Sequence, residues 1–174
     1  MDEATPTDLA PLREPPAAPQ VATHNFRFSE DYDLYPSGAK TKYKNNVMAI
    51  KLLKQIELEK RTATPEEQII LARYVGWGGL ANAFSSTASG WENEYQELKS
   101  LLTDVEYKAA MNSTITAYYT EPDLIRHIYR ALERFGFEGG PDRKILDPGM
   151  GTGNFYSVLP EQYQGTKLYG VELD

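Results

Sequence analysis

The residues best suited to chemistry lie in a glycine-rich segment late in the chain. The short apolar run 144–146 leads into Asp147, and three glycines follow at alternate positions: Gly149, Gly151 and Gly153. Such a loop, followed by a helix start, directs backbone N–H groups into an electropositive concavity. A second short run, 167–171, ends at the acid Glu172, which could accept hydrogen bonds from ribose hydroxyls. The order strand, glycine loop, helix, strand, acid predicts a nucleotide-type cofactor site.

An ordinary glycine turn in an α/β unit is the alternative interpretation of this segment, because glycine serves any tight strand-to-helix turn. Residues 147–155 read Asp-Pro-Gly-Met-Gly-Thr-Gly-Asn-Phe, which is more specific than an isolated glycine motif. The acid also follows the second strand, as a cofactor site requires. We therefore favour descent from a cofactor-binding unit, and leave open whether the cofactor still binds.

The segment 147–155 resembles motif I of the class I S-adenosylmethionine-dependent methyltransferases, in the form typical of DNA adenine-N6 methylases. Residues 170–174 are similar to motif II of that family. Residues 118–125 resemble motif X, although Glu121 stands where a proline often follows Tyr-Thr. The order X, I, II is the order of the group. Residues 40–90 are similar to the leader of large methylase–helicase proteins carried by phages and conjugative elements.

This resemblance implies a fold and a set of cofactor contacts. The fold would be α/β but mostly helical, with a helical amino-terminal region followed by a truncated Rossmann-like methyltransferase half. Thr120 and the helix start after it would face the cofactor's carboxylate. The contacts that the resemblance implies are Thr120, Asp147, Gly149, Gly151, Gly153 and Glu172.

The resemblance stops before the residues that hold the substrate. The family needs an Asn/Asp-Pro-Pro-aromatic motif to hold the flipped adenine. No such tetrapeptide occurs here, and the nearest match, 147–149, already belongs to the glycine loop. The third strand and its adenine-contacting loop are missing as well. We therefore expect no catalytic residue, no required cofactor, and a vestigial site with poor affinity for S-adenosylmethionine.

Composition sets outer bounds on function. The chain has a net charge of −7, no cysteine and two histidines far apart, His24 and His127, so no metal site is expected. No apolar run approaches the ~20 residues that span a bilayer, and no signal peptide is recognisable. We expect a soluble protein in the cytoplasm of a bacterial host. Bases concentrate in 40–61, and the helix face bearing Lys44, Lys51 and Lys54 is expected to be solvated, with phosphate binding as the alternative.

Three segments are expected along the chain: a disordered proline-rich tail at 1–23, an acidic arm with a helical region at 24–112, and the βαβ unit at 113–174. Hydrophobic spacing and helix-start signals predict helices near 43–61, 65–74, 91–102, 104–112 and 121–135, and strands at 144–147 and 167–172. The three expected capping boxes begin at Thr64, Thr103 and Thr120. The last helix should bury Leu124, Ile125, Ile128, Tyr129, Leu132 and Phe135.

Two surfaces are candidates for partner binding. The arm carries aromatic and acidic residues that could anchor on a partner: Phe28, Glu30, Asp31, Asp33 and Tyr35. We favour the alternative that this arm packs on its own domain. With two strands only, the first strand also has an open edge, which invites a partner or a second copy of the chain. That interface would include Ile145, Leu146 and Phe155.

Two functions compete. We favour a non-catalytic, methyltransferase-like counter-defence factor of a mobile element, similar to anti-CRISPR proteins, that blocks DNA binding by an RNA-guided nuclease. An acidic chain binds DNA poorly but suits the basic surface of a nucleic-acid-binding protein; the plainer alternative is that acidity only confers solubility. The second function is the amino-terminal, cofactor-binding part of an active S-adenosylmethionine-dependent N6-adenine DNA methyltransferase.

Overall fold

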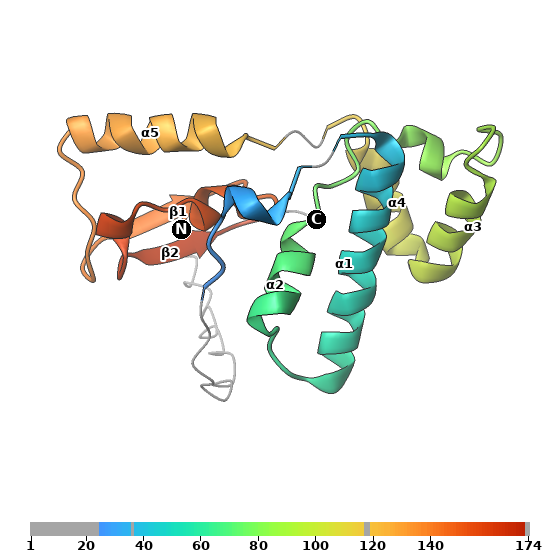
Figure 1. The fold of residues 1–174 in the computed structure, drawn as a ribbon, viewed down its shortest axis with the longest axis horizontal. Helices are drawn as coiled ribbons and strands as arrows, with labels where there is room; N and C mark the ends of the chain where they lie inside the picture. The colour runs from blue at the N-terminus through green and yellow to red at the C-terminus, as the bar shows by residue number, and fades with distance from the viewer. Residues whose placement is uncertain (1–24, 36, 117–118, 173–174) are drawn as a thin grey trace, which may run out of the picture.

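The computed structural model describes residues 25–35, 37–116 and 119–172. The predicted tail 1–23 lies outside these residues, as do Tyr118 of the motif X segment and residues 173–174 of the motif II segment. The described part is mostly helical with a small parallel sheet (Figure 1). Its helices are α1 (Ala39–Glu59), α2 (Pro65–Ala72), α3 (Glu92–Leu101), α4 (Asp104–Ser113), α5 (Pro122–Arg134) and α6 (Asn154–Ser157), and its strands are β1 (Lys144–Asp147) and β2 (Lys167–Gly170).

Helices α1, α3 and α4 and the segment between α2 and α3 contribute to an aromatic core centred on Trp77; the three helices lie in the right half of Figure 1. The Trp77 side chain is 2% exposed, and its ring meets Phe84 edge-on at 5.2 Å between centroids. Phe84 in turn contacts the Tyr107 ring at 5.3 Å. Edge-to-face stacks of this kind add to the free energy gained by burying large rings. Trp77 is therefore a core residue, as predicted, and is not available to stack on a nucleic-acid base.

The basic face of α1 stays in solvent, as predicted: Lys44 is exposed, and the side chains of Lys51 and Lys54 are 55% and 36% exposed. Lysines of α1 also reach acids on α3 and α4. Exposed pairs of this kind each contribute little to stability, about 0–1 kcal/mol, but they neutralise the bases. The pairs are Lys40–Glu94 at 2.6 Å, Lys51–Glu97 at 2.7 Å and Lys54–Glu106 at 3.0 Å.

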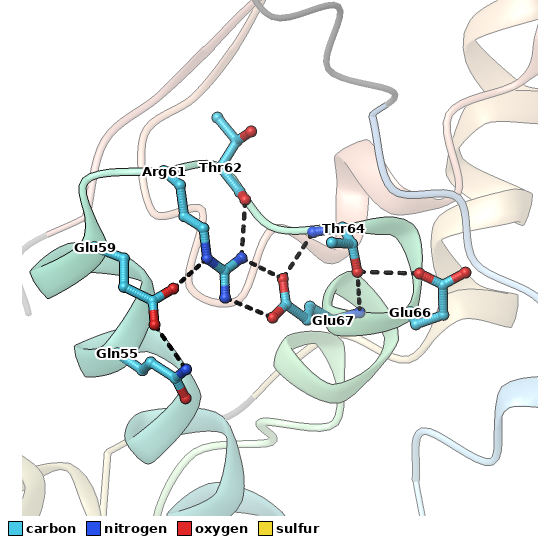
Figure 2. A network of polar contacts seen from close by, with 7 residues as sticks. All are labelled: Gln55, Glu59, Arg61, Thr62, Thr64, Glu66 and Glu67. Carbon is cyan, nitrogen blue, oxygen red and sulfur yellow. Dashed lines mark hydrogen bonds and ion pairs between the residues drawn. The ribbon is translucent and has the colours of Figure 1, made fainter.

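Two of the three predicted capping boxes form, at the starts of α2 and α4. At α2 the Thr64 side chain accepts from the Glu67 N–H, and the Glu67 carboxylate accepts from the Thr64 N–H at 2.9 Å. Figure 2 shows that Glu67 also binds the Arg61 guanidinium through both carboxylate oxygens, at 2.6 and 2.7 Å. This network fixes the junction between α1 and α2. The third box, at Thr120, is wrong, because α5 begins after Glu121 and no side chain caps it.

A second unit, made of α5, β1, α6 and β2, follows the helical region and lies in the left half of Figure 1. It holds β1 and β2 side by side, with α5 packed nearby. The strands are parallel, with Ile145 aligned with Leu168. The Arg143 carbonyl accepts from the Lys167 N–H, and the Asp147 carbonyl accepts from the Val171 N–H. The backbone groups of residues 143, 145 and 147 therefore point towards β2. The backbone of Leu146 consequently points to the opposite edge, which no described strand pairs. A core of Ile125, Tyr129, Leu159 and Tyr163 joins α5 to the sheet.

Helix α5 buries less of its apolar face than the sequence predicts. Ile125 and Tyr129 are 0% and 2% exposed, as expected. The small sheet, however, covers only a narrow line along the helix, and the residues on either side of that line reach solvent. They are Leu124 at 57% exposed, Ile128 at 37%, Leu132 at 36% and Phe135 at 86%.

The arm packs on its own chain, as we favoured. The Phe28 N–H donates to the Ser157 carbonyl at 2.9 Å, and the Phe28 ring lies under the Arg126 guanidinium at 5.1 Å. Leu34 is buried at 4% exposed. Arg73 from the end of α2 donates to the Tyr32 carbonyl. The arm thus contacts both units, although the sequence grouped it with the helical region alone.

Candidate functional site

The glycine loop and the acid after β2 meet at the carboxyl ends of the two strands. The Gly151 N–H donates to the Glu172 carboxylate at 2.6 Å. The Met150 N–H donates to the Val171 carbonyl at 3.0 Å, which ties the loop to the extension of β2. The Asp147 carboxylate accepts from the Gly149 N–H at 3.2 Å and closes the turn. Parallel strands present their carboxyl ends at one edge, where α/β proteins bind ligands.

Thr120 reaches this loop through its backbone rather than through its side chain. Its carbonyl accepts from the Asn154 amide at 3.0 Å, and the Asn154 oxygen accepts from the Thr152 hydroxyl at 3.0 Å. Tyr35 of the arm also hydrogen-bonds Asn154, while burial raises the pKa of its phenol. Asn154, the first residue of α6, therefore joins the start of α5, the glycine loop and the arm.

Tyr156 closes the carboxyl end of the sheet. Its hydroxyl accepts from the Asp147 N–H at 3.1 Å and donates to the Tyr169 carbonyl, so it bridges the ends of β1 and β2. Burial raises the pKa of Tyr156. Burial also raises the pKa of Tyr129 to about 12, with smaller contributions from the Tyr156 and Asp147 charges. Both phenols remain neutral donors beside the loop at physiological pH.

The Tyr119 ring lies against the glycine loop. A Cβ at Gly151, where φ is +51°, would come within 2.8 Å of this ring. Gly151 thus needs glycine for both its backbone angle and its neighbour. Gly149 differs, because its φ lies outside the left-handed region and a Cβ there would meet no atom within 4 Å. The packing of the described residues does not require glycine at 149, whereas close approach of a ligand to the backbone would.

The residues predicted for partner binding lie in two places. Glu30 is 82% exposed and forms a long ion pair of 3.5 Å with Arg126, and Asp31 and Asp33 are exposed beside it. Ile145 and Phe155 are half-buried against the second core and line an open groove of about 400 Å³. The groove runs between α5 and the open edge of β1, with Ile128, Leu132 and Leu146 also in its wall.

Sequence reasoning missed three residues of this site: Tyr119, Asn154 and Tyr156. Asn154 lies inside the glycine motif and Tyr156 just after it, so their positions in the sequence could have predicted that they belong to the site. Tyr119 precedes Thr120 in the motif X segment, but only the fold shows that its ring reaches Gly151.

Within the described residues, no group of three or more histidine and acidic side chains could hold a metal ion. No helix of this part is long and apolar enough to cross a membrane. No protein-family model, no curated protein and no solved structure matches the chain.

Proposed function

We propose that residues 113–174 form the S-adenosylmethionine-binding part of a DNA adenine-N6 methyltransferase. One observation carries the proposal: the Gly151 N–H and the Glu172 carboxylate, which are distant in sequence, meet at 2.6 Å at the carboxyl ends of two parallel strands. That is the place where a doubly wound fold binds the nucleoside and the charged tail of a cofactor. The order of motifs X, I and II along the chain agrees with it.

The residues present fit such a ligand. The Gly151 N–H would receive its carboxylate once Glu172 exchanges its bond to Gly151 for the ribose hydroxyls. Gly149, which the surrounding packing does not require, would let the ligand approach the backbone. When bound, S-adenosylmethionine would supply the methyl group. The parallel pair β1 and β2 would be the start of a Rossmann-like sheet.

The test is calorimetric titration of the full 174-residue chain with S-adenosylmethionine and with S-adenosylhomocysteine. We expect binding, and we expect Gly149→Ala to weaken it by about tenfold or more, because a Cβ would crowd the ligand. Gly149→Ala should leave the melting temperature unchanged, since a Cβ there meets no atom within 4 Å. Glu161→Gln, an exposed acid outside the loop, is the matched control for Glu172→Gln.

A chain that binds neither compound at millimolar concentration would overturn the proposal. Binding that survives both Gly149→Ala and Glu172→Gln unchanged would place the ligand elsewhere and would also overturn it.

A second function is favoured by a different observation, the exposed acids of the arm. Glu30, Asp31 and Asp33 face solvent although the arm is docked on its own chain. Three lysines of α1, Lys40, Lys51 and Lys54, are paired with acids of α3 and α4 and do not offset this charge. Such a surface suits the DNA-binding channel of a nuclease. The chain would then be a non-catalytic counter-defence factor of the anti-CRISPR type in a bacterial host, with no required cofactor.

Pull-down with a purified RNA-guided nuclease, with and without guide RNA, tests this second function. Retention that is lost when Glu30, Asp31 and Asp33 are replaced together by the corresponding amides would support it. Failure to retain any nuclease or to reduce its DNA binding would count against it, and the calorimetric result would decide the first function independently.

A further inference from the structure

The Tyr119 ring sits between two glycines that belong to different units. A Cβ at Gly76 would come within 2.4 Å of ring atoms, and a Cβ at Gly151 would come within 2.8 Å. Gly76 lies in the loop beside Trp77 of the helical region, and Gly151 lies in the glycine loop. The ring therefore fills the space between the helical region and the candidate cofactor site, and it fits there only because both neighbours lack a side chain.

The loop that contains Gly76 is held firmly. Asn46 of α1 is 0% exposed, and its amide donates to the Gly76 carbonyl at 2.7 Å while its oxygen accepts from the Val75 N–H at 3.0 Å. At the other end of the loop, the Gly79 N–H donates to the Thr114 carbonyl at 3.3 Å. A buried side chain that satisfies two backbone groups fixes their position, because losing either bond leaves a desolvated polar group.

We propose that the 75–80 loop, held by Asn46, sets the position of the Tyr119 ring against the glycine loop and thereby the affinity for the methyl donor. The inference rests on the proposed cofactor function and extends it to residues of the helical region. Tyr119 would contact the ligand, a nucleoside carrying a charged amino-acid tail. Gly76 and Asn46 act through Tyr119 and are positioning residues. Close packing transmits a displacement at Gly76 to the ring and from the ring to the ligand.

The structure supplies a matched pair of variants. Gly76 and Gly79 lie in the same loop with φ of +68° and +75°, so alanine strains the backbone similarly at both. A Cβ at Gly76 would strike Tyr119, whereas a Cβ at Gly79 would meet no atom within 4 Å. We expect Gly76→Ala to weaken binding of S-adenosylmethionine by about tenfold, and Gly79→Ala to change it by less than about twofold. Equal effects of the two would overturn the inference.

The double variant keeps the inference testable if Gly76→Ala also lowers stability. In a Tyr119→Ala background the ring is gone, so Gly76→Ala should have no further effect on the dissociation constant. Tyr119→Phe, which keeps the ring, should bind like the wild type. Wild-type affinity in Tyr119→Ala would overturn the inference while leaving the cofactor function standing. Absence of binding by the wild type would instead mean that the cofactor function itself has failed.

Discussion

At the scale of single residues, the candidate site is built mainly from backbone groups and a few bridging side chains. Asn154 joins the glycine loop to Thr120, and Tyr156 joins it to the ends of β1 and β2. The strongest interaction at the loop is the bond from the Gly151 N–H to the Glu172 carboxylate, because a charged acceptor strengthens a hydrogen bond. These contacts hold the glycine loop at the carboxyl ends of the two strands.

The hydroxyl of Tyr156 gives a prediction at this scale. Tyr156→Phe should lower the free energy of unfolding by about 0.5–1.5 kcal/mol, because the hydroxyl's hydrogen bonds with the Asp147 N–H and the Tyr169 carbonyl are lost. Urea denaturation followed by circular dichroism measures the change. Tyr169→Phe is the control, since it removes the hydroxyl of an exposed side chain and keeps the backbone carbonyl that Tyr156 binds. Equal stability of the two variants would show that the bridge contributes nothing.

At the scale of elements, caps and ion pairs decide where helices begin and how they face each other. Thr64 and Thr103 begin helices in the way their spacing predicts, since a capping box is local and needs no partner element. The capping box predicted at Thr120 does not form, because α5 begins one residue later than predicted, after Glu121. The Thr120 carbonyl instead accepts from the Asn154 amide. The exposed apolar residues of α5 also show that a periodic face is buried only as far as another element covers it.

The α1–α2 junction predicts a pH dependence. The Arg61 guanidinium, together with the Thr64 N–H, lowers the pKa of Glu67 from 4.5 to about 2. Because this carboxyl has a lower pKa in the folded protein than in the unfolded chain, its ionised form stabilises the fold. That contribution to the free energy of unfolding is complete above pH 4.5 and is lost as the pH falls from 4.5 towards 2. In urea titrations from pH 7 to pH 2, the stability difference between wild type and Glu67→Gln should shrink across this window. A difference that stays constant with pH would refute the assignment.

At the scale of the whole molecule, two small cores are joined by the arm, and neither outer edge of the two-stranded sheet is paired by a described strand. The helical core is built around Trp77, and the second core is built around Tyr129 and Tyr163. A two-stranded sheet is marginal by itself, so helices carry most of the packing. The acidic net charge and the paired lysines of α1 together argue against direct DNA binding by this part of the chain.

The open edge of β1 predicts self-association. Antiparallel pairing of β1 with a second copy, with Lys144 opposite Leu146, would place Arg143 opposite Asp147 and bury the 62% exposed Leu146. Sedimentation velocity should show a fraction of dimer that increases with protein concentration. Leu146→Lys should abolish the dimer. The conservative control is Leu146→Val, which keeps an apolar, strand-favouring residue. A monomer at every concentration would contradict this prediction.

The sequence alone determined what local chemistry controls: helix positions, two capping boxes, the two strands and the glycine turn. These depend on spacing and backbone preference within a few residues, so the chain carries them directly. The tertiary structure alone decided which of these features meet. It paired Lys51 and Lys54 of α1 with acids of α3 and α4, and it left four of the six predicted residues of the α5 face in solvent. It also set the Tyr119 ring between Gly76 and Gly151. Such contacts depend on how elements distant in sequence pack in space, and residue spacing does not record that packing.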